Sequence, residues 1–144
     1  MANVDIVQLL LDSVEGQLFE CKRAAAAPGK VLESIVAMAN AEGGWVAIGL
    51  EDPSKASGRS RLIGVSESQD NVSELMNQIA KEITPPLHQI KDYDLAMTNI
   101  HGTSDHLKLF VIERSTDIHS LRRGDTLLRK GTHNRKLRSL VKIT

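Results

Sequence analysis

The sequence predicts a mixed α+β domain in which about three helices cover a mostly antiparallel sheet. Apolar residues recur at helical spacing in three segments, and several shorter segments have the alternating or continuous apolar character of strands. The chain has 144 residues, of which 41% are hydrophobic, so one domain can bury a core without disulfides. We therefore expect a single globular unit over residues 1–144.

Each predicted helix has an apolar stripe and a recognisable boundary. The first covers 4–11. The second follows Pro28-Gly29 and stops before Gly43-Gly44, which supply a left-handed end. The third has its stripe between Val72 and Ile83, and the proline pair at 85–86 terminates it.

The strands are predicted from alternation and from short apolar runs. Residues 17–22 alternate, so that Phe19 and Cys21 face one way while Glu20 and Lys22 face the other. Residues 45–50 are continuously apolar, which is typical of a central strand covered on both faces. Further strands are expected at 62–65, 87–100, 107–113 and 126–129.

Composition narrows the class of protein. No run approaches the roughly 18 apolar residues of a membrane span, and the N-terminus is acidic rather than a positively charged leader, so we expect a cytoplasmic protein. The single cysteine, Cys21, excludes an internal disulfide or a multi-cysteine zinc site. The five histidines lack zinc-ligand spacing and are expected at the surface.

Charge is distributed unevenly along the chain. Residues 1–100 hold 8 Lys and Arg against 14 Asp and Glu, whereas residues 101–144 hold 10 against 4. Such a basic segment neutralises phosphates if its cations share one face, and a solvated surface is the alternative. A turn allowed by Gly131 and Asn134 would gather these cations. The predicted nucleic-acid-binding residues are Lys22, Arg23, Arg129, Lys130, His133, Arg135, Lys136 and Arg138.

Three motifs occur together in this chain. They are Glu15 followed by Phe19-Glu20-Cys21-Lys22, the segment 37–50 with its asparagine, paired glycines and isoleucine-glycine, and the segment 128–132. In this combination the sequence resembles the Schlafen/AlbA-like DNA-binding domain family, over about residues 10–138. The resemblance implies a DNA-binding or transcription-regulator-like module.

The same resemblance implies an alternative, because some Schlafen proteins are endoribonucleases that use three carboxylates. The matching positions are Glu15, Glu20 and Glu42, which would bind Mg²⁺ or Mn²⁺ and act on structured RNA such as tRNA. A Schlafen core also packs two related lobes, and this chain carries one, so a homodimer would supply the second.

The residues themselves support part of this chemistry. Glu20 and Lys22 place a hard oxygen ligand and a cation on one strand face, so both are catalytic candidates. Glu15 lies five residues before Glu20 and needs a turn at Gly16 to reach the same face. Glu42 lies at the C-terminal end of a helix, where the helix dipole disfavours an anion. A bound metal or a contact with Lys22 would explain why a glutamate is present at this position. The alternative is an ordinary Glu20–Lys22 ion pair and a solvated Glu42.

Asn40, near the end of the second helix, is expected to bind backbone groups and to fix the turn at Gly43-Gly44. Few aromatic residues are present, so candidates for stacking on unpaired bases are limited to Trp45, Tyr93, Phe19 and Phe110.

Three functions remain open at this point. The first is a nucleic-acid-binding module for DNA or RNA that uses the basic C-terminal segment with Lys22 and Arg23. The second is the metal-dependent endoribonuclease, which requires Glu15, Glu20 and Glu42 to converge. The third is a protein-interaction or assembly domain, which would lack a basic surface.

Overall fold

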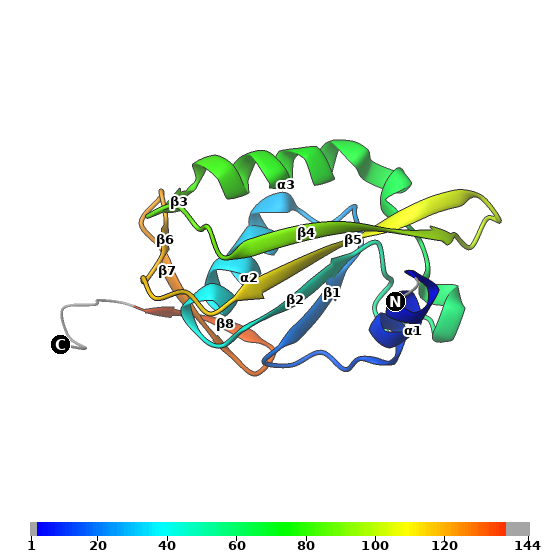
Figure 1. The fold of residues 1–144 in the computed structure, drawn as a ribbon, viewed down its shortest axis with the longest axis horizontal. Helices are drawn as coiled ribbons and strands as arrows, with labels where there is room; N and C mark the ends of the chain where they lie inside the picture. The colour runs from blue at the N-terminus through cyan, green and yellow to red at the C-terminus, as the bar shows by residue number, and fades with distance from the viewer. Residues whose placement is uncertain (1–2, 138–144) are drawn as a thin grey trace.

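The computed structural model describes residues 3–137 (Figure 1). The helices are α1 (Asn3–Asp12), α2 (Pro28–Asn40) and α3 (Gln69–Lys81), with 3-10 helices at Gly58–Arg61 and Val65–Ser68. The strands are β1 (Phe19–Lys22), β2 (Gly43–Ile48), β3 (Ile83–Thr84), β4 (Ile90–Thr98), β5 (Ser104–Glu113), β6 (Ser120–Leu121), β7 (Thr126–Lys130) and β8 (His133–Leu137). The predicted α+β class is confirmed.

One four-stranded sheet organises the fold, with the strand order β1-β2-β5-β4. Strand β1 runs parallel to β2, and the β2–β5 and β5–β4 pairs are antiparallel, so the predicted mixed and mostly antiparallel sheet is confirmed. Strands β3 and β6 pair with each other over two residues, and β7 and β8 form a separate hairpin. Figure 1 shows α1 and this hairpin at opposite ends of the sheet.

The three helices form in the predicted segments, but α3 ends at Lys81, before the prolines, and Ile83, predicted to be the last residue of its stripe, is in β3. Pro28 opens α2, a position at which a missing backbone N–H costs nothing. On α3, Leu75 is buried, while Val72, Met76 and Ile79 pack against the core from the same stripe. No helix within residues 3–137 combines the length and the apolar character that crossing a membrane requires.

The two faces of the sheet belong to different hydrophobic clusters. Val46 and Phe110 point into the larger cluster, with α2, α3 and Leu127 of β7. Ala47 and Leu109, one position along each strand, point into the smaller cluster, which α1 covers. Cys21 lies in the α1 cluster with Phe19, on the face that the alternation predicts for both, and it is buried.

The paired glycines allow α2 to return directly into β2. Gly43 has a φ of +79°, and a Cβ there would collide with the backbone of β5 at Ile112. A Cβ on Gly44 would lie 2.8 Å from the Leu18 carbonyl oxygen and 2.9 Å from the Met38 sulfur. The glycines therefore permit close backbone approach, and the helix itself ends earlier, at Asn40.

Three sequence expectations are corrected. Residues 62–65 form no strand, because Gly64 has a φ of +87°, and only Leu62 bridges, to Leu50. Asn40 binds backbone groups, but those of His119 and Leu127 rather than the glycine turn. His119 is buried, not exposed, with its ring nitrogens bonded to the Pro85 carbonyl and the Ser115 hydroxyl.

Candidate nucleic-acid interface

The β7–β8 hairpin divides the predicted basic cluster between two faces. Antiparallel register pairs Arg129 with Asn134 and Lys130 with His133, and paired residues point to the same side. Arg129 therefore points inward with buried Leu127, whereas Lys130 and its partner point outward. Arg135, opposite Leu128, shares that outward face.

Arg129 is the centre of a buried hydrogen-bond network. Its side chain is 1% exposed, and Nη1 donates to Glu20 Oε1 and to Asn134 Oδ1, both at 2.8 Å. Nε and Nη2 donate to the Gly16 carbonyl at 3.2 and 2.9 Å. The expected phosphate contact by Arg129 is thus corrected: its donors bind the protein itself, and no phosphate can reach them.

Gln17 reinforces the same junction between the hairpin and the segment before β1. Its amide donates to the Arg129 carbonyl at 2.9 Å, and its carbonyl accepts from the Gly131 N–H at 2.8 Å. On the other side of the hairpin, Asn134 donates to Ser34 of α2 at 2.8 Å. The hairpin is therefore fixed between α2 and the segment 16–20.

The outer face of the hairpin consists of Lys130, His133 and Arg135, all exposed. No carboxylate within residues 3–137 forms an ion pair with any of them. Lys130 and Arg135 are diagonal neighbours across the register, and residues in that relation are typically about 7–8 Å apart. This spacing lets both heads meet one phosphate backbone. We call Lys130, His133 and Arg135 the outer cation face.

The remaining predicted cations do not join this face. Lys136 points to the opposite side and pairs with Asp125 at 3.4 Å. Arg23 forms ion pairs with Glu51, at 2.9 Å, and with Glu67. The hydrogen bond to Glu67 is the largest contribution to the raised pKa of Arg23. Lys22 is half-buried at the far end of β1. Arg138 lies outside the described residues.

The predicted carboxylate triad does not assemble. Glu20 is buried and paired with Arg129, and its second oxygen, Oε2, is buried without a hydrogen-bond partner. Glu15 accepts the Cys21 N–H at 3.1 Å on the outer edge of β1, because the chain bends at residues 16–18. The chain thus changes direction at Gly16, but Glu15 binds a backbone group and does not meet Glu20.

Glu42 lies in the turn between α2 and β2, four residues before Val46, which is the strand position opposite Glu20. Glu42 is exposed, and no Lys22 contact explains it, which corrects that expectation. No group of three or more His, Cys, Asp or Glu in the described part of the chain could hold a metal ion. These residues do not fit a Mg²⁺ or Mn²⁺ site.

Comparison with known families identifies the fold. The family model described as Schlafen, AlbA_2 matches residues 15–138. The chain belongs to the Schlafen/AlbA_2 family. Membership suggests a function related to nucleic acids, which agrees with the resemblance carried by the three motifs.

One solved structure of a longer protein contains a region with a fold similar to that of this Schlafen/AlbA_2 domain. The crystal structure of the DIP2311 protein from Corynebacterium diphtheriae is similar, with a TM-score of 0.58 and 17% sequence identity. The similarity covers 92% of this chain and 26% of that one, so the chain spans about a quarter of its length. At this identity the similarity shows the fold alone. No curated protein matches the chain.

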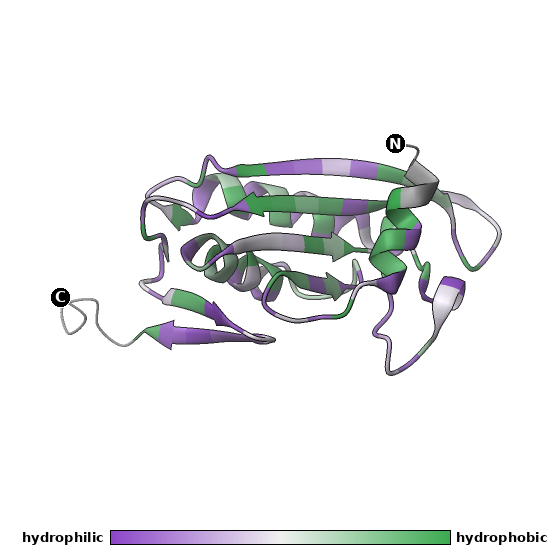
Figure 2. Cartoon of the chain, turned by 60° about the horizontal axis from the view of Figure 1, so that its bottom comes forward, coloured by the Kyte–Doolittle hydropathy of each residue, from purple (hydrophilic) through white to green (hydrophobic). Residues whose placement is uncertain are grey.

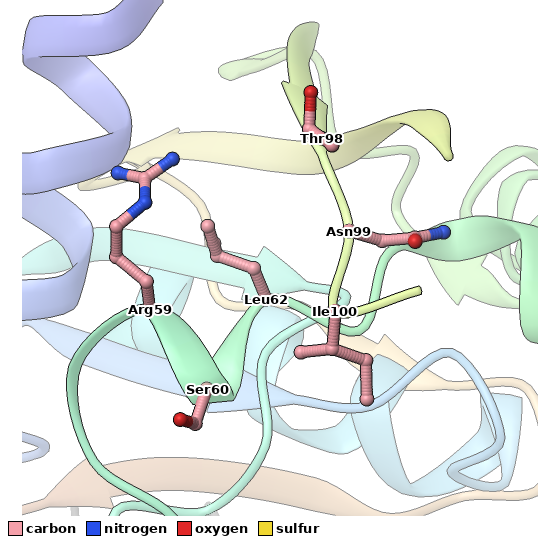
Figure 3. A pocket seen from close by; sticks show the side chains of 6 residues that line it. All are labelled: Arg59, Ser60, Leu62, Thr98, Asn99 and Ile100. Atoms are coloured by element: carbon pink, nitrogen blue, oxygen red, sulfur yellow. The ribbon is translucent and has the colours of Figure 1, made fainter. Parts of the chain in front are cut away.

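A hollow of about 610 Å³ lies at the other end of the Schlafen/AlbA_2 domain, where β4 ends (Figure 3). In Figure 3 the Asn99 amide points away from Arg59, and it is occupied internally: Nδ2 donates to Asp105 at 3.0 Å, and Oδ1 accepts the His101 N–H at 2.9 Å. Among the described residues that line the hollow, Arg59 is the charged one. Nothing in the sequence pattern predicts this hollow.

Proposed function

We propose that this domain binds nucleic acid through the outer cation face of the β7–β8 hairpin. The observation that carries the proposal is that Lys130 and Arg135 lie side by side on an exposed face and form no ion pair with any carboxylate of residues 3–137. Cations that are already neutralised by protein carboxylates release no counterions on binding, whereas unpaired ones do. The family membership supports the same class of partner.

Hydrogen bonds on the inner side of the hairpin hold the outer cation face in place. Arg129, Gln17 and Asn134 tie the hairpin to α2 and to the segment before β1. A hairpin held in this way presents its cations without ordering a flexible loop first, which reduces the entropy cost of association. The contacts involve phosphate charge, so binding is to DNA or RNA without strong sequence preference.

The first test removes charge from the outer cation face. The double variant Lys130→Gln/Arg135→Gln should bind a 20-nucleotide single strand and a duplex more weakly, because two phosphate contacts are lost. The slope of log K against log salt should become shallower by about 2. Fluorescence anisotropy at several salt concentrations measures both quantities.

The matched control is Lys55→Gln/Lys81→Gln, which removes the same charge from two exposed lysines distant in sequence from the hairpin. This control should retain the wild-type slope. Equal loss of affinity in both double variants would show that binding follows net charge alone, and it would remove the outer cation face from the account.

Cleavage is measured in the same samples. Labelled tRNA incubated with Mn²⁺ or with EDTA should stay intact, because Glu20 is paired with Arg129 and the carboxylates Glu15 and Glu42 do not meet it. Cutting that requires Mn²⁺ and disappears in Glu20→Ala would instead establish the endoribonuclease alternative, with carboxylate positions different from those described.

A further inference from the structure

Half of one face of the sheet has no helix over it. On the α1 side, Val7, Leu10 and Leu11 of α1 cluster with Leu95 and the middle of β5. Beyond α1, Figure 2 shows the start of β2 and the end of β5 open to the viewer, to the left of the helix. We call the exposed part around Trp45, Val111, Lys91 and Tyr93 the open half-sheet.

Two aromatic side chains lie on the open half-sheet. The register places Trp45 opposite Val111, Val111 opposite Lys91, and Tyr93 opposite Leu109, so all of these side chains share the α1 side of the sheet. Tyr93 is 46% exposed, and Trp45 is half-buried. Aromatic rings on an exposed sheet face are the type of group on which unpaired bases stack.

The open half-sheet carries one exposed cation, Lys91, and one exposed carboxylate on the same face, Glu113 at the end of β5. Lys91 is exposed and forms no ion pair with a carboxylate in residues 3–137. Beside it lies a hollow of about 150 Å³, lined by His88, Gln89, Ile90, Lys91, Val111 and Glu113.

The open half-sheet and the outer cation face point in the same direction. Helix α2 packs behind the sheet through Val46 and behind the hairpin through Leu127, because all three belong to one cluster. Trp45 directly precedes Val46, and Lys130 lies three positions after Leu127, so by strand alternation both point away from α2. Gln17 connects the hairpin to the start of β1, and Figure 2 shows the hairpin below the open part of the sheet.

We propose that the open half-sheet is a base-stacking site, and that the ligand of this domain is single-stranded nucleic acid. The phosphate backbone lies on Lys130 and Arg135, and unpaired bases continue across β1 onto Trp45 and Tyr93. A duplex keeps its base faces stacked on each other and engages only the cations. The inference rests on the proposed function and specifies its substrate class.

The chain contains one tryptophan, so Trp45 reports directly on the site. Titration with oligo-dT or oligo-U of 12 nucleotides should quench its fluorescence, because a base stacked on the indole provides a route for energy loss. A 12-base-pair duplex at the same bound fraction, followed by anisotropy of a label on the nucleic acid, should leave the emission unchanged.

The variant Tyr93→Leu keeps an apolar residue on the strand and removes the ring. It should bind the single strands at least about fivefold more weakly and bind duplex as the wild type does. Tyr93→Phe, which retains the ring, should restore single-strand affinity. Because Tyr93 is exposed, the fold of both variants should be unaffected, and thermal unfolding checks this.

The outcomes separate the two proposals. If single strands and duplex bind equally, without Trp45 quenching, and Lys130→Gln/Arg135→Gln weakens both, the stacking site is wrong while the outer cation face stands. If no nucleic acid binds, both proposals are wrong. Concentration-dependent dimerisation that Tyr93→Leu abolishes would assign the open half-sheet to a second copy and overturn the stacking site.

Discussion

Burial and a neighbouring carboxylate both raise the pKa of the Cys21 thiol. Burial, followed by the charge of Glu15, raises its pKa from 9.0 to about 11, although the Arg61 guanidinium donates to its sulfur at 3.3 Å. The unfolded thiol ionises at lower pH than the folded one. The stability associated with the neutral thiol is therefore complete below pH 9 and is lost as the pH rises towards 11.

Raising the pH from 8 to 11 should thus lower the free energy of unfolding by about 2 to 3 kcal/mol more in the wild type than in Cys21→Ala. Urea unfolding at both pH values measures the difference, and the variant subtracts the effect of lysines and the tyrosine that titrate in the same range. Parallel declines in the two proteins would show that Cys21 does not carry this pH dependence.

Some site residues could be predicted from the sequence and others could not. Alternation along residues 19–22 correctly placed Cys21 and Glu20 on opposite faces. The burial of Arg129 was missed because its partner, Glu20, lies 109 residues earlier in the chain. The sequence did hold one local indication: in a strand over 126–129, Arg129 lies on the same face as Leu127, which is buried.

At the scale of elements, the hairpin and β1 are joined by the Glu20–Arg129 pair, whose side chains are 7% and 1% exposed. Removing one partner leaves an uncompensated buried charge, so Glu20→Gln and Arg129→Met should each destabilise the protein by about 3–5 kcal/mol. The double variant should cost less than the sum of the two, because it leaves no unpaired charge.

Urea unfolding of the four proteins in this cycle gives the coupling free energy between the two residues. Additivity within about 0.5 kcal/mol would mean that the two side chains act independently, and the hairpin would then be held mainly by Gln17 and Asn134. Lys81→Gln, on the far helix α3, provides a control that should change stability little.

Elements with a strong periodic signal were predicted well, and those without one were not. The helices and the long strands β4 and β5 have apolar patterns that a window of residues reveals. Strand β8, with the sequence HNRKL, contains one apolar residue and was expected to be a turn. It forms a strand because β7 supplies its pairing partners and α2 supports Asn134.

At the scale of the whole molecule, the net charge is zero, but the outer cation face carries positive charge. Carboxylates of the chain pair with Arg23, Arg123, Arg129 and Lys136, whereas none in the described part of the chain pairs with the outer cation face. The α+β class followed from local patterns. The position of the hairpin beside β1 did not, because it depends on contacts between residues more than 100 positions apart.

The central claim is that nucleic acid occupies the hairpin and the adjoining open half-sheet. The most direct test is the backbone amide NMR spectrum of the isotopically labelled chain, at 15.8 kDa, with and without a 12-nucleotide single strand. We predict shift changes at residues 130–135 and around Trp45 and Tyr93, with α3 unaffected. Changes confined to α3, or to the hollow beside Arg59, would contradict the account.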